Sequence, residues 1–230
     1  MGVREEGKNR RRDKITAAAR FLIQSGESGF RMRALAEEAG VSIATPYNLF
    51  GSKRAILTAV MDADLSRFKE TLARQNADSL SMFQKTVSIA RELVELDPQF
   101  YRNVMLTAYA RAPESDRTRL LHWQQLIDNA VADGFILTFT DSMELATHLR
   151  QLFASSFHRW AKEEISIREA EAQINYSIAL SLAGVATPTS KQRLHSNLRT
   201  YQEALRTIRM RKMCSTAISN RAMNRRFSQA

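Results

Sequence analysis

The stretch RMRALAEEAGVSIATPYNLFGSKR, residues 31–54, holds two short helical patterns separated by a turn. Apolar side chains at positions 32, 35, 36 and 39 follow the i, i+3, i+4, i+7 spacing of one helical face, and Gly40 ends this pattern. A second short helix is expected from about Ile43 to Phe50, with Ser42 as its N-cap. Two short helices joined by a tight glycine-containing turn are typical of the helix-turn-helix, whose second helix enters the major groove of DNA.

The first residues of the second helix carry small or medium side chains, which can lie close to base edges. Thr45 can donate or accept a hydrogen bond, and Ile43 and Ala44 can contact the methyl group of thymine. Asn48, one turn further on, can form two hydrogen bonds with adenine. We therefore expect this end of the helix to read the base sequence.

The flanking residues are candidates for contacts to the DNA backbone. The Tyr47 hydroxyl can donate to a phosphate, and Lys53 lies at a helix start, where free N–H groups already favour an anion. Arg33 can reach a guanine or the backbone. A structural alternative stays open, because any two packed helices can resemble the motif and Tyr47 can be a half-buried aromatic residue. The predicted DNA-contacting residues are Arg33, Ser42, Ile43, Ala44, Thr45, Tyr47, Asn48 and Lys53.

Upstream of the motif, another helical stripe is expected to end at Gly26 and is formed by Ile15, Ala18, Ala19 and Leu22. Arg10, Arg11 and Arg12 are expected to precede this helix within a basic arm over residues 1–12. Such an arm can follow the DNA backbone or enter a minor groove. It can equally be a solvated leader.

The stretch from Ile15 to Met61 resembles the DNA-binding domain of the tetracycline-repressor (TetR) family. The matching residues span three helices and reach into a fourth: Ile15, Ala18, Ala19, Leu22, Gly26, Leu35, Ala36, Ala39, Gly40, Val41, Ser42, Thr45, Tyr47, Phe50, Ser52, Lys53 and Leu57. A few positions depart from the family pattern. Arg31 stands where a threonine cap is usual, Pro46 replaces a leucine, and Asn48 with Leu49 replaces an aromatic or histidine pair. Gly51 replaces a proline or charged residue.

The resemblance implies an all-α fold, with an N-terminal three-helix DNA-binding domain and a larger helical domain for effector binding and dimerisation. It implies a homodimer that binds a near-palindromic operator, usually as a repressor, and that leaves DNA when an effector shifts the fourth helix. By position, the base-facing residues would be Arg33, Ile43, Ala44, Thr45 and Asn48. Tyr47 and Lys53 would face phosphates.

The rest of the chain continues with helical spacing, which predicts four regions. Residues 1–12 are the basic arm, 13–55 the DNA-binding domain, 56–212 the ligand-binding and dimerisation domain, and 213–230 a basic tail expected to be disordered. Asp141 and Ser166 have the spacing of capping boxes and open two long helices. Residues 186–190 are expected to be a linker before a last helix that begins at Lys191.

The charge of the chain is unevenly distributed. The formal net charge is +10, with 11 Lys/Arg against 6 Asp/Glu in residues 1–60 and 10 against 1 in residues 187–230, while the region between them is mildly acidic. Basic ends favour a polyanionic partner. The alternative interpretation is a solvated basic surface.

The composition narrows the class of protein. A chain of 230 residues with 44% hydrophobic residues can bury a core, and 8 glycines with 4 prolines favour helices over strands and turns. The single cysteine, Cys214, cannot form an internal disulfide, which fits a reducing cytoplasm. We find no secretory signal and no stretch of about 20 apolar residues, so we expect a cytoplasmic protein without a membrane partner.

Large side chains in the second region are candidates for an effector pocket that takes an apolar or aromatic ligand. They are Phe100, Tyr101, Met105, Tyr109, Trp123, Phe153 and Phe157. For any one of these residues, an ordinary core position is the alternative.

The two long helices over residues 141–163 and 166–186 could pair across a two-fold axis as a four-helix bundle, which would make the protein a homodimer. Packing within one chain is the alternative.

Two other function classes are open. A non-specific nucleic-acid binder would use only the basic ends. A helical enzyme has less support, because the sequence shows neither a glycine-rich phosphate loop nor a nucleophile paired with a base. Glu144 and His148 could be half of a metal site, but two ligands do not hold a metal. We therefore expect no catalytic residue, no metal and no cofactor.

Overall fold

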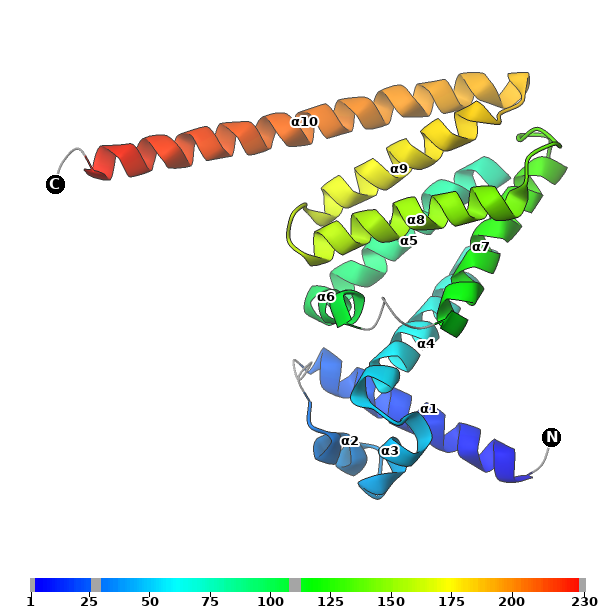
Figure 1. Cartoon of the computed structure of the whole chain (residues 1–230), viewed down its shortest axis with the longest axis vertical. Coiled ribbons are helices and arrows are strands. Elements are labelled where there is room, and N and C mark those ends of the chain that lie inside the picture. The colour runs from blue at the N-terminus through cyan, green and yellow to red at the C-terminus, as the bar shows by residue number, and fades with distance from the viewer. Residues whose placement is uncertain (1–2, 26–29, 108–112, 228–230) are drawn as a thin grey trace.

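The computed structural model describes residues 3–25, 30–107 and 113–227, which form ten α-helices (Figure 1). In chain order the helices are α1 (Val3–Gln24), α2 (Met32–Glu38), α3 (Ala44–Phe50), α4 (Lys53–Ala73), α5 (Ser79–Leu96), α6 (Pro98–Thr107), α7 (Pro113–Ala132), α8 (Ser142–Ala161), α9 (Ile167–Gly184) and α10 (Pro188–Phe227). The predicted all-α class is confirmed. The strand-like run at 135–139 forms one isolated antiparallel bridge, between Ile136 and Ala186.

Two parts of the molecule are joined by the long helix α4. Helices α1 to α3 form a small head at one end, and α5 to α10 form the body (Figure 1). The expected domain boundary at 55 and 56 falls in the first turn of α4, so one helix runs from head to body. Buried apolar side chains form a single connected cluster from Ile15 in α1 to Leu194 in α10.

Local capping explains where several helices begin. The Ser52 hydroxyl accepts a hydrogen bond from the Ala55 N–H, and the Asp141 carboxylate accepts bonds from the N–H groups of Met143 and Glu144. Ser166 caps α9 in the same way, through the Glu169 N–H. These caps satisfy backbone donors that have no partner in the first turn of a helix, and they confirm the predicted helix starts.

Helix α1 begins earlier than the sequence suggested. It starts at Val3, so Arg10 to Arg12 lie inside the helix, and the expectation that they precede it is wrong. Its first turn carries Glu5 and Glu6, whose negative charges favour the N-terminal end of a helix dipole. No proline interrupts the chain between this turn and Ile15. Gly26 lies outside the described residues.

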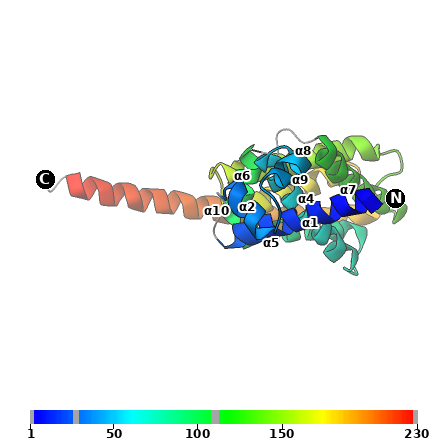
Figure 2. The same cartoon turned by 90° about the horizontal axis from the view of Figure 1, so that it is seen from below.

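Helix α10 is also longer than expected at both ends. It begins at Pro188 instead of Lys191, since proline is well suited to the first helical position. Its helical backbone continues to Phe227, whereas we expected a disordered tail over residues 213–230. The apolar spacing does weaken there, but residues 191–227 contain neither glycine nor proline to end the helix. Figure 2 shows α10 extending well beyond the body.

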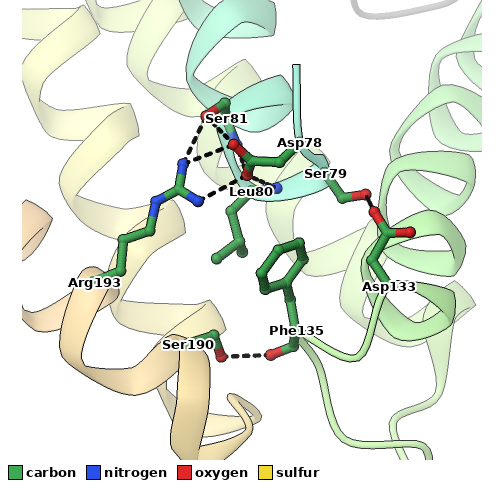
Figure 3. Close-up of polar contacts among 8 residues, drawn as sticks. All are labelled: Asp78, Ser79, Leu80, Ser81, Asp133, Phe135, Ser190 and Arg193. Atoms are coloured by element: carbon green, nitrogen blue, oxygen red, sulfur yellow. Dashed lines mark hydrogen bonds and ion pairs between the residues drawn. The ribbon is translucent and has the colours of Figure 1, made fainter. Parts of the chain in front are cut away.

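The start of α10 is fastened to the body by polar contacts (Figure 3). The Arg193 guanidinium donates to both carboxylate oxygens of Asp78, at 2.9 and 3.0 Å, and to the Ser81 hydroxyl at 2.6 Å. This pairing lowers the pKa of Asp78 to about 2. Ser190 donates to the Phe135 carbonyl at 2.6 Å. Helix α10 is therefore held against α5 and the loop after α7.

Candidate DNA-binding surface

The turn between α2 and α3 has a defined geometry that depends on one glycine. Gly40 has φ of +62°, a conformation that is strained for other residues. Its N–H donates to the Glu37 carbonyl at 3.1 Å, and the Val41 N–H donates to the Ala36 carbonyl at 2.9 Å. These two bonds form a Schellman motif, which ends α2 and turns the chain toward α3. The predicted helix-turn-helix is present in the structure.

Helix α3 has two distinct faces. Pro46 is buried, and Leu49 and Phe50 pack against the core. On the opposite face, Ile43 and Tyr47 are 54% and 49% exposed although both are large and apolar or aromatic. Because positions 43, 44, 47 and 48 share one side of a helix, Ile43, Ala44, Tyr47 and Asn48 form one solvent-facing surface. Ala44 and Asn48 are exposed with them.

The start of α3 differs in detail from the sequence expectation. Ser42 was expected to be the N-cap, but Ile43 occupies that position and no side chain caps the helix there. The Ser42 hydroxyl instead forms a 2.8 Å hydrogen bond with the Thr45 hydroxyl. Thr45 also donates its N–H to the Ser42 carbonyl, at 2.9 Å. Ser42 and Thr45 therefore fix each other's side chains at the tip of the motif.

Pro46 and Gly51, which depart from the family pattern, are both compatible with the backbone conformation at their positions. Pro46 is the third residue of α3, where a backbone N–H would have no partner within the helix, so no hydrogen bond is lost. Gly51 ends α3 with φ of +74°. Arg31 precedes α2 in extended geometry and provides no side-chain cap.

Both charged residues among the predicted contacts already have partners within the chain. Arg33 is on the surface of α2 and donates through Nε to Glu37 at 3.0 Å. Lys53 donates to the Phe30 carbonyl at 2.8 Å, and its Nζ lies 4.5 Å from the centre of the Phe30 ring. Burial lowers the pKa of Lys53. A DNA phosphate would therefore compete with the Phe30 carbonyl for this ammonium group.

Arg12 has a structural role that sequence reasoning missed. Its Nη1 donates to the Leu49 carbonyl in the last turn of α3, and its guanidinium lies 4.3 Å from the centre of the Phe50 ring. A cation at this end of a helix is favourable for the helix dipole. A signal was available in the sequence, because Arg12 shares its helical face with Ile15, Ala19 and Leu22. Arg10 and Arg11 remain exposed.

A buried polar cluster connects the head to the body. Arg20 of α1 forms an ion pair with Asp64 of α4, which is only 5% exposed. The Tyr101 hydroxyl of α6 donates to the same carboxylate at 2.6 Å and accepts from Arg20 Nη2 at 3.0 Å. Burial raises the pKa of Tyr101 well above its usual range, so its proton is held. This cluster ties three helices together at the junction.

The predicted pocket residues lie among the packed rings of the body. Phe100, Tyr101, Trp123 and Phe157 are buried, and Met105 and Phe153 are half-buried; Tyr109 lies outside the described residues. The ring centres of Trp123 and Phe153 are 5.5 Å apart, and those of Phe153 and Phe157 are 4.7 Å apart. Ring spacings of this size are those of packed aromatic side chains.

The described residues contain neither a cluster that could hold a metal ion nor a helix that could cross a membrane. Over these residues, no group of three or more His, Cys, Asp or Glu side chains is arranged to hold a metal ion. His148 forms a 3.1 Å hydrogen bond with Ser181. Each helix in the described ranges is too short or too polar to cross a membrane.

Comparison with known proteins agrees with this geometry. The family model described as "Bacterial regulatory proteins, tetR family" matches residues 15–60, which span α1 to α4. The HTH-type transcriptional repressor KstR of Mycobacterium tuberculosis is 23% identical over 185 residues, covering 76% of this chain and 82% of that protein.

Solved structures share the fold of most of the chain. A TetR-family transcriptional regulator from Pectobacterium atrosepticum has a TM-score of 0.64 at 22% identity, covering 79% of this chain and 97% of that one. A gamma-butyrolactone receptor has a TM-score of 0.50 at 20% identity, covering 86% of this chain and 98% of that one. Residues 15–60 therefore match the DNA-binding domain of the tetR family of bacterial regulatory proteins, and the protein is a DNA-binding transcriptional regulator.

Proposed function

We propose that the protein is a homodimeric repressor that binds a near-palindromic operator and leaves it when a small-molecule effector binds. The observation that carries this proposal is the outward face of α3, where Ile43, Ala44, Tyr47 and Asn48 are exposed together. A protein gains nothing in stability by exposing a large apolar residue such as Ile43, whereas a thymine methyl group would bury it. The relative KstR is named a repressor, which supports repression, as opposed to activation, of the regulated genes.

The residue roles within this proposal follow the geometry. Ile43, Ala44, Thr45 and Asn48 contact bases, and Tyr47 and Lys53 contact phosphates once Lys53 leaves the Phe30 carbonyl. Arg33 contacts a base or the backbone in place of Glu37. Ser42 holds the Thr45 hydroxyl in position.

The dimer is proposed to form through α8 and α9. A palindromic operator requires two heads related by a two-fold axis. Leu180 on α9 and Met143 on α8 are 53% and 39% exposed, so apolar surface is available on both helices. Helix α10 already packs against α9, and its Leu194 and Leu205 are buried.

The effector is proposed to be an apolar or aromatic molecule that enters among the rings of α6, α7 and α8. Phe153 and Met105 are the half-buried members of this set and would move first. We propose no catalytic activity, and we place the regulator in the cytoplasm, where bacterial DNA lies. One structural neighbour is a receptor for gamma-butyrolactone, which supports a ligand-binding body for this fold.

Footprinting on the DNA that flanks the coding region tests this function. In moderate salt with excess competitor, we expect protection of an inverted repeat whose half-sites lie about 34 Å apart, or a small multiple of that distance. Asn48→Ala should lose the protection. Asn76→Ala is the matched control, because it makes the same substitution at an exposed position between α4 and α5, outside the head.

The main rival is a non-specific binder that uses the basic N- and C-terminal regions. Its signature would be uniform retardation of all DNA fragments, which disappears as salt is raised, without any protected repeat. Asn48→Ala would then have no effect, and the proposed function would be rejected.

A further inference from the structure

An open cleft lies beside the polar cluster that joins head and body. It has a volume of about 410 Å³ and is bounded by α1, α4 and α5, with Arg20 and Asp64 in its wall. A second hollow of about 180 Å³ lies between α1 and α4 and shares Arg20, Asp64 and Arg67 with the cleft. The larger volume is in the range of small-molecule sites. The Arg20–Asp64 ion pair is therefore reachable by a ligand.

One side of the cleft is apolar. Phe68 of α4 and Leu93 of α5 line it, together with Leu96 at the end of α5. Leu96 is 82% exposed, which is high for a leucine that adjoins other apolar side chains. A hydrocarbon chain placed along these residues would remove apolar surface from water, which is the main source of affinity for apolar groups.

Each acidic residue in the cleft wall accepts at least one hydrogen bond or forms an ion pair within the chain. Asp64 accepts from Arg20 and Tyr101. Glu92 accepts from Arg91 and from Ser88, at 3.4 and 3.2 Å. Asp97 accepts the Phe100 N–H through Oδ1, while its Oδ2 is buried and has no hydrogen-bond partner. Asp64 is therefore compensated by Arg20 and Tyr101, and the Asp97 oxygen without a partner is shielded from solvent.

The basic side of the cleft has donors available. Arg67 is exposed, and within the described residues its side chain takes part in no ion pair. Burial lowers the pKa of Arg20, and the positive charge of Arg67 lowers it as well, so the two guanidinium groups lie within electrostatic reach of each other. A carboxylate between them would relieve this repulsion, and guanidinium groups bind carboxylates through paired N–H donors.

We propose that this cleft binds an amphipathic carboxylate, with its hydrocarbon chain along Phe68, Leu93 and Leu96 and its carboxylate on Arg67. The bound carboxylate also competes with Asp64 for Arg20, which loosens the tie between α1 and α6. The cleft adjoins the aromatic cluster of the body, because the Arg20 guanidinium lies 5.1 Å from the centre of the Phe100 ring, but no predicted pocket residue lines the cleft. Only the consequence for DNA rests on the proposed function; the binding itself does not.

Calorimetric titration of the full chain with straight-chain carboxylates, from hexanoate to tetradecanoate and below their aggregation concentrations, tests the site without DNA. We expect saturable binding that strengthens with chain length. Decanol and decyltrimethylammonium keep the chain but change the head group, and they should bind at least tenfold more weakly than decanoate. Equal binding of the three head groups, or no binding by any carboxylate, would overturn the proposal.

Variants locate the binding in the cleft. Arg67→Ala should weaken decanoate binding by about tenfold or more. Leu96→Ser should weaken the binding of the longer-chain carboxylates more than that of the shorter ones. Arg74→Ala is the matched control, because it removes the same charge from an exposed arginine that caps the end of α4. If Phe153→Ala weakens decanoate binding and Arg67→Ala does not, the carboxylate binds among the aromatic rings, and the cleft is not the site.

A second readout separates this inference from the function of the head. Decanoate should reduce affinity for the footprinted operator in the wild type and much less in Arg67→Ala, whose affinity for DNA without decanoate should be unchanged. Loss of operator recognition in the absence of decanoate would count against the proposed function and leave the titration result standing. Decanoate binding without any effect on DNA affinity would overturn the competition for Arg20.

Discussion

The head and the body differ in what their large side chains do. On α3 of the head, Ile43 and Tyr47 face solvent, although burying them in the small core of the head would have stabilised the fold. In the body, Phe100, Trp123 and Phe157 are almost fully buried, and the rings of Trp123 and Phe157 both pack against Phe153. Exposed apolar side chains indicate a partner, whereas buried ones are explained by folding alone. The binding surface of the head can therefore be identified more directly than a pocket in the body.

The two regions are nonetheless connected by one helix and one charge cluster. Helix α4 begins in the head and ends in the body, and Asp64 on it binds both Arg20 of α1 and Tyr101 of α6. A change in the body can reach the head through contacts of this kind and through the apolar core that the two regions share. Variants that change the stability of the body without changing operator binding by the head, or the reverse, therefore test this difference between the two regions.

The largest expected effect concerns the body. Trp123→Ala should reduce the free energy of unfolding by about 3–5 kcal/mol, because the indole is buried between Phe83 and Phe153 and the mutation leaves a cavity. Urea denaturation followed by circular dichroism measures it. Phe139→Ala is the control, since that ring is 77% exposed and its loss should change stability little. A small effect of Trp123→Ala would mean that the rings enclose space for a ligand instead of forming core.

The next effect concerns the base-reading face of the head. Asn48→Ala should cost about 1–3 kcal/mol of operator affinity and relax the preference at one base pair in each half-site. The free energy of unfolding should not change, because Asn48 is exposed. Binding titrations on the operator and on its single-base variants measure both quantities. A loss that is equal on every sequence would assign Asn48 to the backbone.

A smaller effect is expected at Arg12. Arg12→Ala should weaken operator binding by about 1 kcal/mol, because one hydrogen bond to the end of α3 and one contact with Phe50 are lost. The dependence of affinity on salt should stay the same, since Arg12 holds the helix and does not neutralise a phosphate. Arg11→Ala is the matched neighbour, and a phosphate contact there would lower the salt slope by about 1. The same loss of slope for Arg12→Ala would contradict its positioning role.

The smallest effect concerns the attachment of α10. The pKa of Asp78 is lowered to about 2 by Arg193, so its contribution to stability is present above the unfolded pKa near 4 and is lost as pH falls toward 2. Both side chains are partly exposed, so Arg193→Ala should cost only about 0.5 kcal/mol at neutral pH. Thermal unfolding from pH 7 to pH 2 measures it. The difference between wild type and variant should shrink toward pH 2, and a difference that grows would refute the assignment.

Much of the fold follows from local signals in the sequence. Ser52, Asp141 and Ser166 cap helices as their spacing predicts, and Gly40 adopts the positive φ that the turn requires. These features depend on a few neighbouring residues, so sequence reasoning can find them. The helix boundaries at Val3 and Phe227 were missed, because a polar stretch without proline can be helical or disordered with the same composition.

Contacts between distant segments could not be predicted in this way. The partnership of Arg12 with Leu49 and the cluster of Arg20, Asp64 and Tyr101 join residues that are far apart in the chain. Lys53 was expected to contact a phosphate, but its ammonium group donates a hydrogen bond to the Phe30 carbonyl. Sequence spacing places side chains on a helical face, but it does not say which other helix that face meets.

The ratio of affinities for the footprinted operator and for a scrambled duplex of the same length and composition tests the central claim most directly. Both are measured by competition at one physiological salt concentration. A sequence-reading head predicts a preference of at least about 10³-fold for the operator, and Asn48→Ala should reduce that preference. A ratio near one, with affinities that fall together as salt rises, would contradict the claim and leave only electrostatic attraction by the basic parts of the chain.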